Sequence, residues 1–143
     1  MLVAAGIALG AVGVAYGAHF QGTSGDDEIH VTQSGSNTAA LLAGDDEYEG
    51  AGGTGGADHV KGGTGEDLIL GRAYRDSLRG GPGDDVLDGG GRPDGLYGRA
   101  GDDRLIGGAG DDLFRPGKGH DTCVGQRTDF GLPRRCEVVE IVD

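Results

Sequence analysis

Between Gly53 and Val124 the apolar and polar positions of the chain repeat every nine residues without an insertion. In each of the eight consecutive copies the eighth position is apolar, and the seventh and ninth positions beside it are mixed in character. The eighth-position residues are Val60, Ile69, Leu78, Leu87, Leu96, Leu105, Phe114 and Cys123. This order of outward, inward and outward side chains predicts a three-residue strand with one buried residue in every copy.

The first six positions of each copy are rich in glycine and predict a turn, because neither a strand nor a helix favours so many glycines. Short strands joined by turns at a fixed period predict a solenoid in which each copy contacts only its neighbours. No segment has the length and spacing of an amphipathic helix. The expected fold class is therefore all-β.

Irregular copies precede the uninterrupted array. Residues 22–30 (GTSGDDEIH) fit the nine-residue frame, and residues 31–40 fill the next slot with one extra residue and no Asp, so that Ser36 stands where Asp is expected. Residues 41–49 (LLAGDDEYE) return to the frame, and residues 50–52 form a three-residue insertion. The repeat region is thus expected to span residues 19–124.

Composition adds a condition to this fold. Glycine makes up 33 of the 143 residues without the three-residue period of collagen, and there is no Trp to build a large core. The formal net charge of −12 argues against nucleic-acid binding. A chain so acidic and so poor in apolar residues is typical of disorder, so the repeat is expected to be ordered only when cations neutralise its acids.

The sixth position of the repeat carries the candidate chemistry, because it is an Asp in all eight regular copies and in two irregular ones. Glycine-rich turns allow several carbonyl oxygens to point into one concavity, and the Asp adds a carboxylate there. An all-oxygen site of this kind suits Ca²⁺ and needs no Cys or His. The candidate ligands are Asp27, Asp46, Asp58, Asp67, Asp76, Asp85, Asp94, Asp103, Asp112 and Asp121, with the turn glycines Gly65, Gly83, Gly101, Gly110 and Gly119.

The nonapeptides GGPGDDVLD (80–88), GGTGEDLIL (62–70) and GGAGDDLFR (107–115) resemble those of the repeats-in-toxin family, the hemolysin-type calcium-binding repeats. The resemblance covers roughly residues 22–124. It implies a parallel β-roll, a β-solenoid with two nonapeptides per coil. It also implies that Ca²⁺ binds between the turns of one copy and the next copy but one, with the position-8 residues inside.

Two copies per coil place the turns in two ladders. The first ladder holds the copies beginning at 22, 41, 62, 80, 98 and 116, which all keep Gly at position 4 and Asp at position 6. The second ladder holds the copies beginning at 31, 53, 71, 89 and 107, where Tyr74 and Arg92 replace Gly at position 4. We expect the first ladder to bind Ca²⁺ strongly, in up to five intervals, and the second to bind few ions. Arg72, Arg75 and Arg92 are candidates for the positive charge there.

Electrostatics favours folding that depends on metal. Carboxylates stacked about 5 Å apart repel one another unless cations lie between them, and one buried apolar residue in nine cannot offset the entropy of ordering the backbone. Five Ca²⁺ ions would add about +10 to the formal −12. We therefore expect a largely disordered chain that folds as Ca²⁺ binds.

The ends of the chain leave the period. Residues 1–18 form an uncharged apolar run that is expected to be a signal sequence or its remnant, with a short membrane anchor or a first strand as alternatives. Residues 125–143 are expected to cap the last coil, with a strand over 138–142. Cys123 and Cys136 are expected to form a disulfide that pins this cap, the alternative being two free thiols.

Catalysis is not expected. Paired acids such as Asp84-Asp85 recur with the repeat and are interpreted as ladder elements, and the four histidines share no spacing typical of a zinc site. The match of residues 50–55 to a dinucleotide-binding G-x-G-x-x-G lacks the βαβ context.

The expected function is a secreted, extracellular, non-catalytic calcium-binding β-roll with no small-molecule substrate; a cell-surface or protein partner is left open. The alternative is a C-terminal export and folding module of a secreted enzyme or toxin.

Overall fold

The structure is a computed structural model of the 143-residue chain, and it describes residues 2–3, 19–31, 35–52, 55–126, 136 and 138–141. All regular structure in these residues is β, arranged in two parallel sheets. Sheet A contains, in order, β1 (Leu2–Val3), β2 (His19–Gln21), β4 (Thr38–Ala43), β6 (His59–Thr64), β8 (Ser77–Pro82), β10 (Gly95–Ala100) and β12 (Leu113–Lys118). Sheet B contains β3 (Glu28–His30), β5 (Glu47–Glu49), β7 (Leu68–Leu70), β9 (Val86–Gly91), β11 (Arg104–Ala109), β13 (Thr122–Gly125) and β14 (Val138–Ile141).

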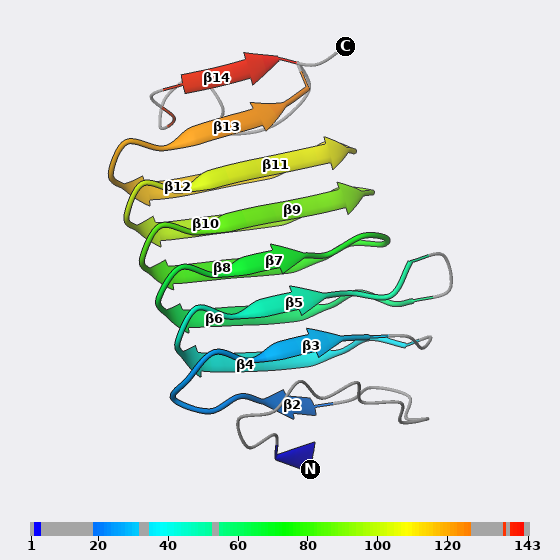
Figure 1. Cartoon of the computed structure of the whole chain (residues 1–143). Helices are drawn as coiled ribbons and strands as arrows, with labels where there is room; N and C mark the ends of the chain where they lie inside the picture. Colours follow the sequence, from blue (N-terminus) through cyan, green and yellow to red (C-terminus); the bar gives the residue numbers. More distant parts are fainter. Residues whose placement is uncertain are drawn as a thin grey trace.

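From β2 to β13, consecutive strands alternate between the two sheets, so two nonapeptides complete one coil (Figure 1). The register shows the same period, because Leu96 lies beside Leu78 on one side and beside Phe114 on the other, each eighteen residues away in the sequence. The predicted parallel β-solenoid with two repeats per coil is confirmed.

The strands are longer than the three residues predicted. In β8, for example, residues 80–82 continue the strand, and Gly81 and Pro82 pair with Arg99 and Ala100 of β10. Glycine is a poor strand former in isolation, but here Gly81 and Pro82 pair with the next coil, and the carbonyl of Pro82 accepts a hydrogen bond from the N–H of Gly65 in the preceding coil. The turn therefore shrinks to positions 4–6 of the repeat in most copies.

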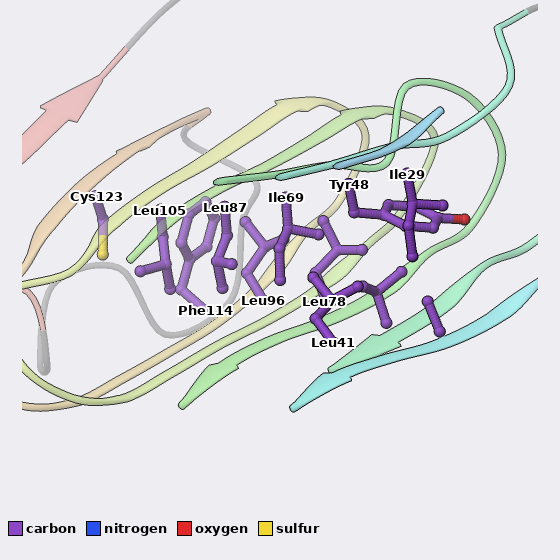
Figure 2. Close-up of a cluster of buried hydrophobic side chains, with 12 residues drawn as sticks. Ile29, Leu41, Tyr48, Ile69, Leu78, Leu87, Leu96, Leu105, Phe114 and Cys123 are labelled. Carbon is purple, nitrogen blue, oxygen red and sulfur yellow. The ribbon is translucent and has the colours of Figure 1, made fainter. Parts of the chain in front are cut away.

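The interior is a single column of apolar side chains between the sheets (Figure 2). All eight predicted position-8 residues are buried, with at most 1% of each exposed. Ile29 and Tyr48 occupy the same position in the two irregular copies, and Leu41 adds a side chain from position 1. Each burial contributes about 1.5 to 3 kcal/mol, so the core is narrow and relies on the turns for further stability.

Both irregularities of the repeat fall on the edge that carries the second ladder. Stacked first-ladder residues are nineteen apart at Asp27 and Asp46 and twenty-one apart at Asp46 and Asp67, yet their contacts persist. The chain turns regularly along one edge and bulges on the other between β5 and β6 (Figure 1). The first ladder therefore runs without interruption.

The register corrects two sequence assignments on that second edge. The N–H of His59 donates to the carbonyl of Asn37, and Thr38 lies beside His59, so Asn37 and not Ser36 stands at the Asp position. The N–H of Gly50 donates to the Leu70 carbonyl at 2.8 Å, as that of Gly71 donates to Asp88. Gly50 is therefore position 1 of its turn, and the extra residues follow it. The sequence spacing shows that extra residues are present in 31–40 and near 50–52 but not which residues they are, because only pairing with the next coil fixes the register.

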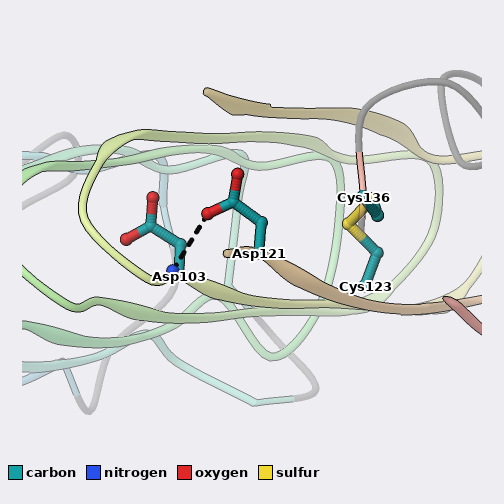
Figure 3. The surroundings of a disulfide bond; sticks show 4 residues. All are labelled: Asp103, Asp121, Cys123 and Cys136. Atoms are coloured by element: carbon teal, nitrogen blue, oxygen red, sulfur yellow. Dashed lines mark hydrogen bonds between the residues drawn. A yellow bond between two sulfur atoms is a disulfide. The ribbon is translucent and has the colours of Figure 1, made fainter. Parts of the chain in front are cut away.

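The C-terminal end of the solenoid is closed by β14, which pairs in parallel with β13. The disulfide between Cys123 and Cys136 is present, with the two Cα atoms 5.8 Å apart (Figure 3). Cys123 is fully buried at position 8, so the disulfide attaches residue 136 directly to a side chain of the core. This confirms the predicted bond.

At the other end, Leu2–Val3 pairs with Phe20 and Gln21 of β2. The signal sequence expected over residues 1–18 lies mostly outside the described residues and remains an expectation. In the part of the chain that the structure describes, no helix is long and apolar enough to cross a membrane.

Candidate metal centre

The position-6 aspartates line the inside of both edges of the solenoid. All ten predicted Asp side chains are buried, with 0 to 7% exposed. In the first ladder the N–H of Asp85 donates to Oδ1 of Asp103 at 3.0 Å, and the N–H of Asp103 donates to Oδ1 of Asp121 at 3.0 Å (Figure 3). In the second ladder the N–H of Asp76 donates to Oδ1 of Asp94 at 2.7 Å. In these turns one carboxylate oxygen accepts a hydrogen bond from the backbone of the preceding coil.

The other carboxylate oxygen has no partner at most turns. Seven of these Oδ2 atoms are buried without a hydrogen bond: those of Asp46, Asp67, Asp85 and Asp103 in the first ladder, and of Asp76, Asp94 and Asp112 in the second. A buried charged oxygen without a partner is costly, by more than the 1 to 3 kcal/mol typical of a neutral group. A cation at each of these atoms would remove that cost.

Backbone oxygens converge on the same places. A Cβ on Gly71 would lie 2.5 Å from Oδ2 of Asp76 and 2.9 Å from the carbonyl oxygen of Gly89 in the next turn. A Cβ on Gly89 would lie 2.5 Å from Oδ2 of Asp94 and 2.9 Å from the Gly107 carbonyl oxygen. Position-1 glycine therefore keeps open a small space bordered by a carboxylate and a carbonyl oxygen, which are ligands that Ca²⁺ prefers.

The first ladder repeats this arrangement. A Cβ on Gly98 would overlap both Oδ2 of Asp103 and the carbonyl oxygen of Pro116. Among the described residues no three His, Cys, Asp or Glu side chains are placed to hold a metal ion together. Ions in these spaces would accordingly depend on carbonyl oxygens for much of their coordination, and the residues present fit a hard cation such as Ca²⁺.

Burial shifts the titration of these carboxyl groups. Removal from water, partly offset by a backbone hydrogen bond, raises the pKa of Asp85 to about 6 and those of Asp67 and Asp103 to about 7. In the second ladder the same cause raises the pKa of Asp76 to about 7 and that of Asp94 to about 8. Without a cation, the folded chain therefore holds protons on these groups close to neutral pH.

The first carboxylate of each ladder, Asp27 in the first and Asp58 in the second, is different, because protein groups donate hydrogen bonds to its Oδ2 atom. Oδ2 of Asp58 accepts a 3.0 Å hydrogen bond from the hydroxyl of Tyr48, and its Oδ1 accepts a 2.8 Å hydrogen bond from Nδ2 of Asn37. Oδ2 of Asp27 accepts a 2.6 Å hydrogen bond from the N–H of Thr23. These two predicted ligands lack the free oxygen that marks the seven others, and the sequence gives no sign of this because Tyr48 reads as an ordinary core residue.

Apart from Asn37, which stands at position 6 of one second-ladder turn, the two ladders differ at position 5. On the first ladder the N–H of Asp102 donates to Oδ1 of Asp84 at 2.7 Å, and the N–H of Glu66 donates to Oδ1 of Asp45 at 2.9 Å. This outer acidic row consists of Asp26, Asp45, Glu66, Asp84 and Asp102. The second ladder has Ala57, Arg75, Pro93 and Asp111 at that position. The first ladder therefore has the more negative field.

Position 4 of the turn keeps a positive φ even where glycine is missing. The candidate glycines Gly65, Gly83, Gly101, Gly110 and Gly119 have φ between 129° and 151°. Tyr74 and Arg92 stand at the same position with φ of 81° and 86°, a left-handed conformation that costs a non-glycine residue about 1 to 2 kcal/mol. The second ladder therefore keeps a positive φ at position 4, at a cost to the folded state that the glycine turns do not have.

Of the arginines expected to supply charge to the second ladder, Arg72 has another partner. Its Nη2 forms an ion pair with Oε1 of Glu49 on sheet B. Glu49 also accepts from His30 at 2.7 Å, and these two partners lower the pKa of Glu49. The charge of Arg72 is therefore directed to the outer face of sheet B.

The model of the RTX calcium-binding nonapeptide repeat, which comprises four copies, matches the chain at residues 52–73, 61–96 and 89–123. The overlapping matches run from residue 52 to residue 123, just over half of the chain. They cover the regular copies on both ladders. No curated protein and no solved structure matches the chain.

Proposed function

Because the chain belongs to the family of RTX calcium-binding nonapeptide repeats, we propose that it is a secreted, non-catalytic β-roll that folds as Ca²⁺ binds between its stacked turns. The observation that carries this proposal is the set of seven buried Oδ2 atoms without a partner. A bound Ca²⁺ ion supplies positive charge and accepts oxygen ligands there. The aspartates and the position-1 carbonyls of the next turn are the groups that would hold it.

Calcium binding and folding are one equilibrium in this proposal. The spaces beside Gly71, Gly89 and Gly98 are bordered by a carboxylate oxygen of one turn and a carbonyl oxygen of the next, so they exist only when the coils are stacked. The binding free energy then becomes folding free energy. A narrow core and a formal charge of −12 support a chain that remains unfolded without calcium.

Both ladders take part, with unequal strength. The free oxygens number four on the first ladder and three on the second, and the carboxylate stacks are alike. The outer acidic row adds negative potential only on the first ladder, so its sites bind Ca²⁺ more tightly. The second ladder is thus a weaker set of sites instead of a nearly empty one.

Two features support secretion. A structural disulfide joins Cys123 to Cys136, and such bonds persist mainly in oxidising compartments. Weak calcium sites of the extracellular type, with Kd of about 10⁻⁴ to 10⁻³ M, would leave the chain unfolded at cytosolic calcium levels and folded outside. The acids engage in contacts between coils, which supports a structural instead of a catalytic use.

A calcium titration followed by far-UV circular dichroism tests the proposal, with calorimetry to count the ions. We expect a disordered spectrum in chelator, a cooperative rise of β signal at millimolar Ca²⁺, and little effect of Mg²⁺, which demands a tighter octahedral shell. A full β signal that persists in chelator at pH 8 would overturn calcium-driven folding. Secretion is tested separately, by the N-terminal sequence of the mature protein recovered from culture medium.

A further inference from the structure

Sheet A has an unusual charge for this acidic chain. Its strands from β2 to β12 contain no Asp or Glu, whereas the chain as a whole has 24 acids against 12 Lys and Arg. The same strands carry five cationic side chains: Lys61, Arg79, Arg99, Arg115 and Lys118. The acids lie in the turns and on sheet B, so the outer face of sheet A is positive.

Three of these strands place an aromatic ring between two guanidinium groups. Tyr97 of β10 lies in register with Arg79 of β8 on one side and with Arg115 of β12 on the other. The guanidinium carbons of Arg79 and Arg115 lie 5.9 Å and 5.8 Å from the centre of the Tyr97 ring. These three residues, with Arg99, Gly117 and Lys118, line a hollow of about 460 Å³, which we call the basic hollow.

Among the residues that the structure describes, no acid forms an ion pair with a donor of the basic hollow. The ion pairs in the described part of the chain involve His30 and Arg72 with the acids of sheet B, and none involves a cation of the hollow. Nε of Arg79 is shielded from water and has no hydrogen-bond acceptor. Positive charges gathered on one face repel one another and attract an external anion.

We propose that the basic hollow binds an acidic polysaccharide through its carboxylate or sulfate groups. Guanidinium groups bind such planar or tetrahedral anions through paired N–H donors. Arg79 and Arg115 are two strands apart, a distance of roughly 10 Å along the solenoid, which suits charged groups spaced along an extended polymer. The Tyr97 ring between them offers an aromatic surface to the C–H groups of a sugar.

The surroundings of the hollow favour this occupant over nucleic acid. Double-stranded DNA carries about one charge per 1.7 Å of its axis, and its wide phosphate envelope would meet the acidic row of Glu66, Asp84 and Asp102 along the neighbouring edge. A thin chain with sparser charges can lie over sheet A and stay clear of that row. This inference concerns sheet A and does not depend on how many Ca²⁺ ions the turns bind.

Binding is tested on the folded chain in excess Ca²⁺, by tyrosine fluorescence and calorimetry, with polygalacturonate and dextran sulfate as the probes. Neutral dextran, a DNA oligonucleotide and anionic lipid vesicles are the comparison ligands. The test variant is Arg79→Gln with Arg115→Gln, and the matched control is Arg104→Gln, which removes a charge from the outer face of sheet B. Circular dichroism in Ca²⁺ verifies that each variant folds.

We expect binding to at least one acidic polysaccharide and none to neutral dextran. The double variant should lose at least tenfold in affinity, and Arg104→Gln should change it by less than twofold. Preference between polygalacturonate and dextran sulfate then assigns the carboxylate or the sulfate source. The proposal is overturned by failure to bind either polymer, by equal losses in the two variants, or by tighter binding of DNA or vesicles.

Discussion

The hydroxyl of Tyr48 donates a 3.0 Å hydrogen bond to Oδ2 of Asp58, the carboxylate oxygen that has no partner at seven other turns. Burial raises the pKa of Tyr48, so the phenol remains a donor. Nδ2 of Asn37 donates to Oδ1 of the same carboxylate. Two neutral side chains thus donate hydrogen bonds to Asp58, whereas other turns leave one carboxylate oxygen without a donor. At this end of the second ladder, protein groups take the place that a cation would have at the other turns.

Removing that hydroxyl should make the fold more dependent on calcium. We expect Tyr48→Phe to lower the free energy of unfolding by about 1 to 3 kcal/mol at low Ca²⁺, because a buried acceptor loses its donor. At high Ca²⁺ part of this loss should be recovered, since the freed oxygen becomes available to an ion. Urea unfolding at sub-millimolar and at ten-millimolar Ca²⁺ measures both. Tyr97→Phe on the outer face serves as control, and equal losses at the two concentrations would contradict the interpretation.

Neutralising one position-6 carboxylate should distinguish the two ladders. Asp85→Asn and Asp76→Asn each keep Oδ1 as an acceptor and remove the charge. We expect each to lose at least one ion by calorimetry and about 3 kcal/mol of stability in Ca²⁺, the stabilisation by an ion at a hundredfold excess over its Kd. The midpoint of the calcium titration should rise more for Asp85→Asn, because Asp84 and Asp102 flank its site. Equal shifts would show that the outer acidic row has no effect.

Acid should promote folding when calcium is absent. The folded-state pKa of Asp67 is about 7 and that of Asp94 about 8, whereas an unfolded Asp titrates near about 3.9. Groups with a raised folded pKa stabilise the fold fully below the unfolded pKa and lose this contribution as pH rises through the folded pKa. In chelator we therefore expect β signal to increase from pH 8 to about pH 5.

In excess Ca²⁺ the pH dependence should have the opposite sign, because protons compete with the ion for the same carboxylates. Far-UV circular dichroism against pH, in chelator and in Ca²⁺, measures the two curves. Curves with the same slope in both solutions would show that these carboxyl groups do not hold the ions.

The space beside a position-1 glycine should not tolerate a methyl group. A Cβ at Gly80 would overlap Oδ2 of Asp85, whereas nothing lies within 4 Å of a Cβ at Gly25. We expect Gly80→Ala to lose the ion at Asp85 and about 3 kcal/mol of stability in Ca²⁺, and Gly25→Ala to bind calcium normally. Calorimetry counts the bound ions of the two variants, and urea unfolding measures their stability. A Gly80→Ala protein with wild-type calcium affinity would show that no ion lies in the space beside Gly80.

Opening the disulfide should weaken the C-terminal end. In the chain-entropy model a loop of the size closed by Cys123 and Cys136 contributes about 3 kcal/mol. We expect reduction of the native chain, or the double change of both cysteines to Ser, to lower stability in Ca²⁺ by about that amount. Urea unfolding with and without reductant measures the effect. The double variant should be insensitive to reductant, which separates the bond from other actions of the thiol.

The nine-residue period was sufficient to predict a solenoid, the buried position-8 column and the position-6 aspartates, and the resemblance to the repeats-in-toxin family implied the two repeats per coil that divide the aspartates into two ladders. These features depend on local rules: alternation in a short strand, the freedom of glycine in a turn, and one acid at a fixed offset. The period placed Cys123 on an inward position, and the bond to Cys136 was predicted from the secretion expected of the apolar N-terminal run.

Other features depend on how coils stack, and no local rule predicts them. Asn37 takes the Asp position because parallel pairing with β6 sets its register, and residues 80–82 join a strand because a neighbouring coil bonds their backbone. Arg79, Tyr97 and Arg115 are eighteen residues apart and meet only across three stacked strands. The sequence alone therefore determined the repeating unit and its inward and outward faces. The tertiary structure decided which carboxylate oxygens are free and where the cations gather, because both depend on contacts between successive coils.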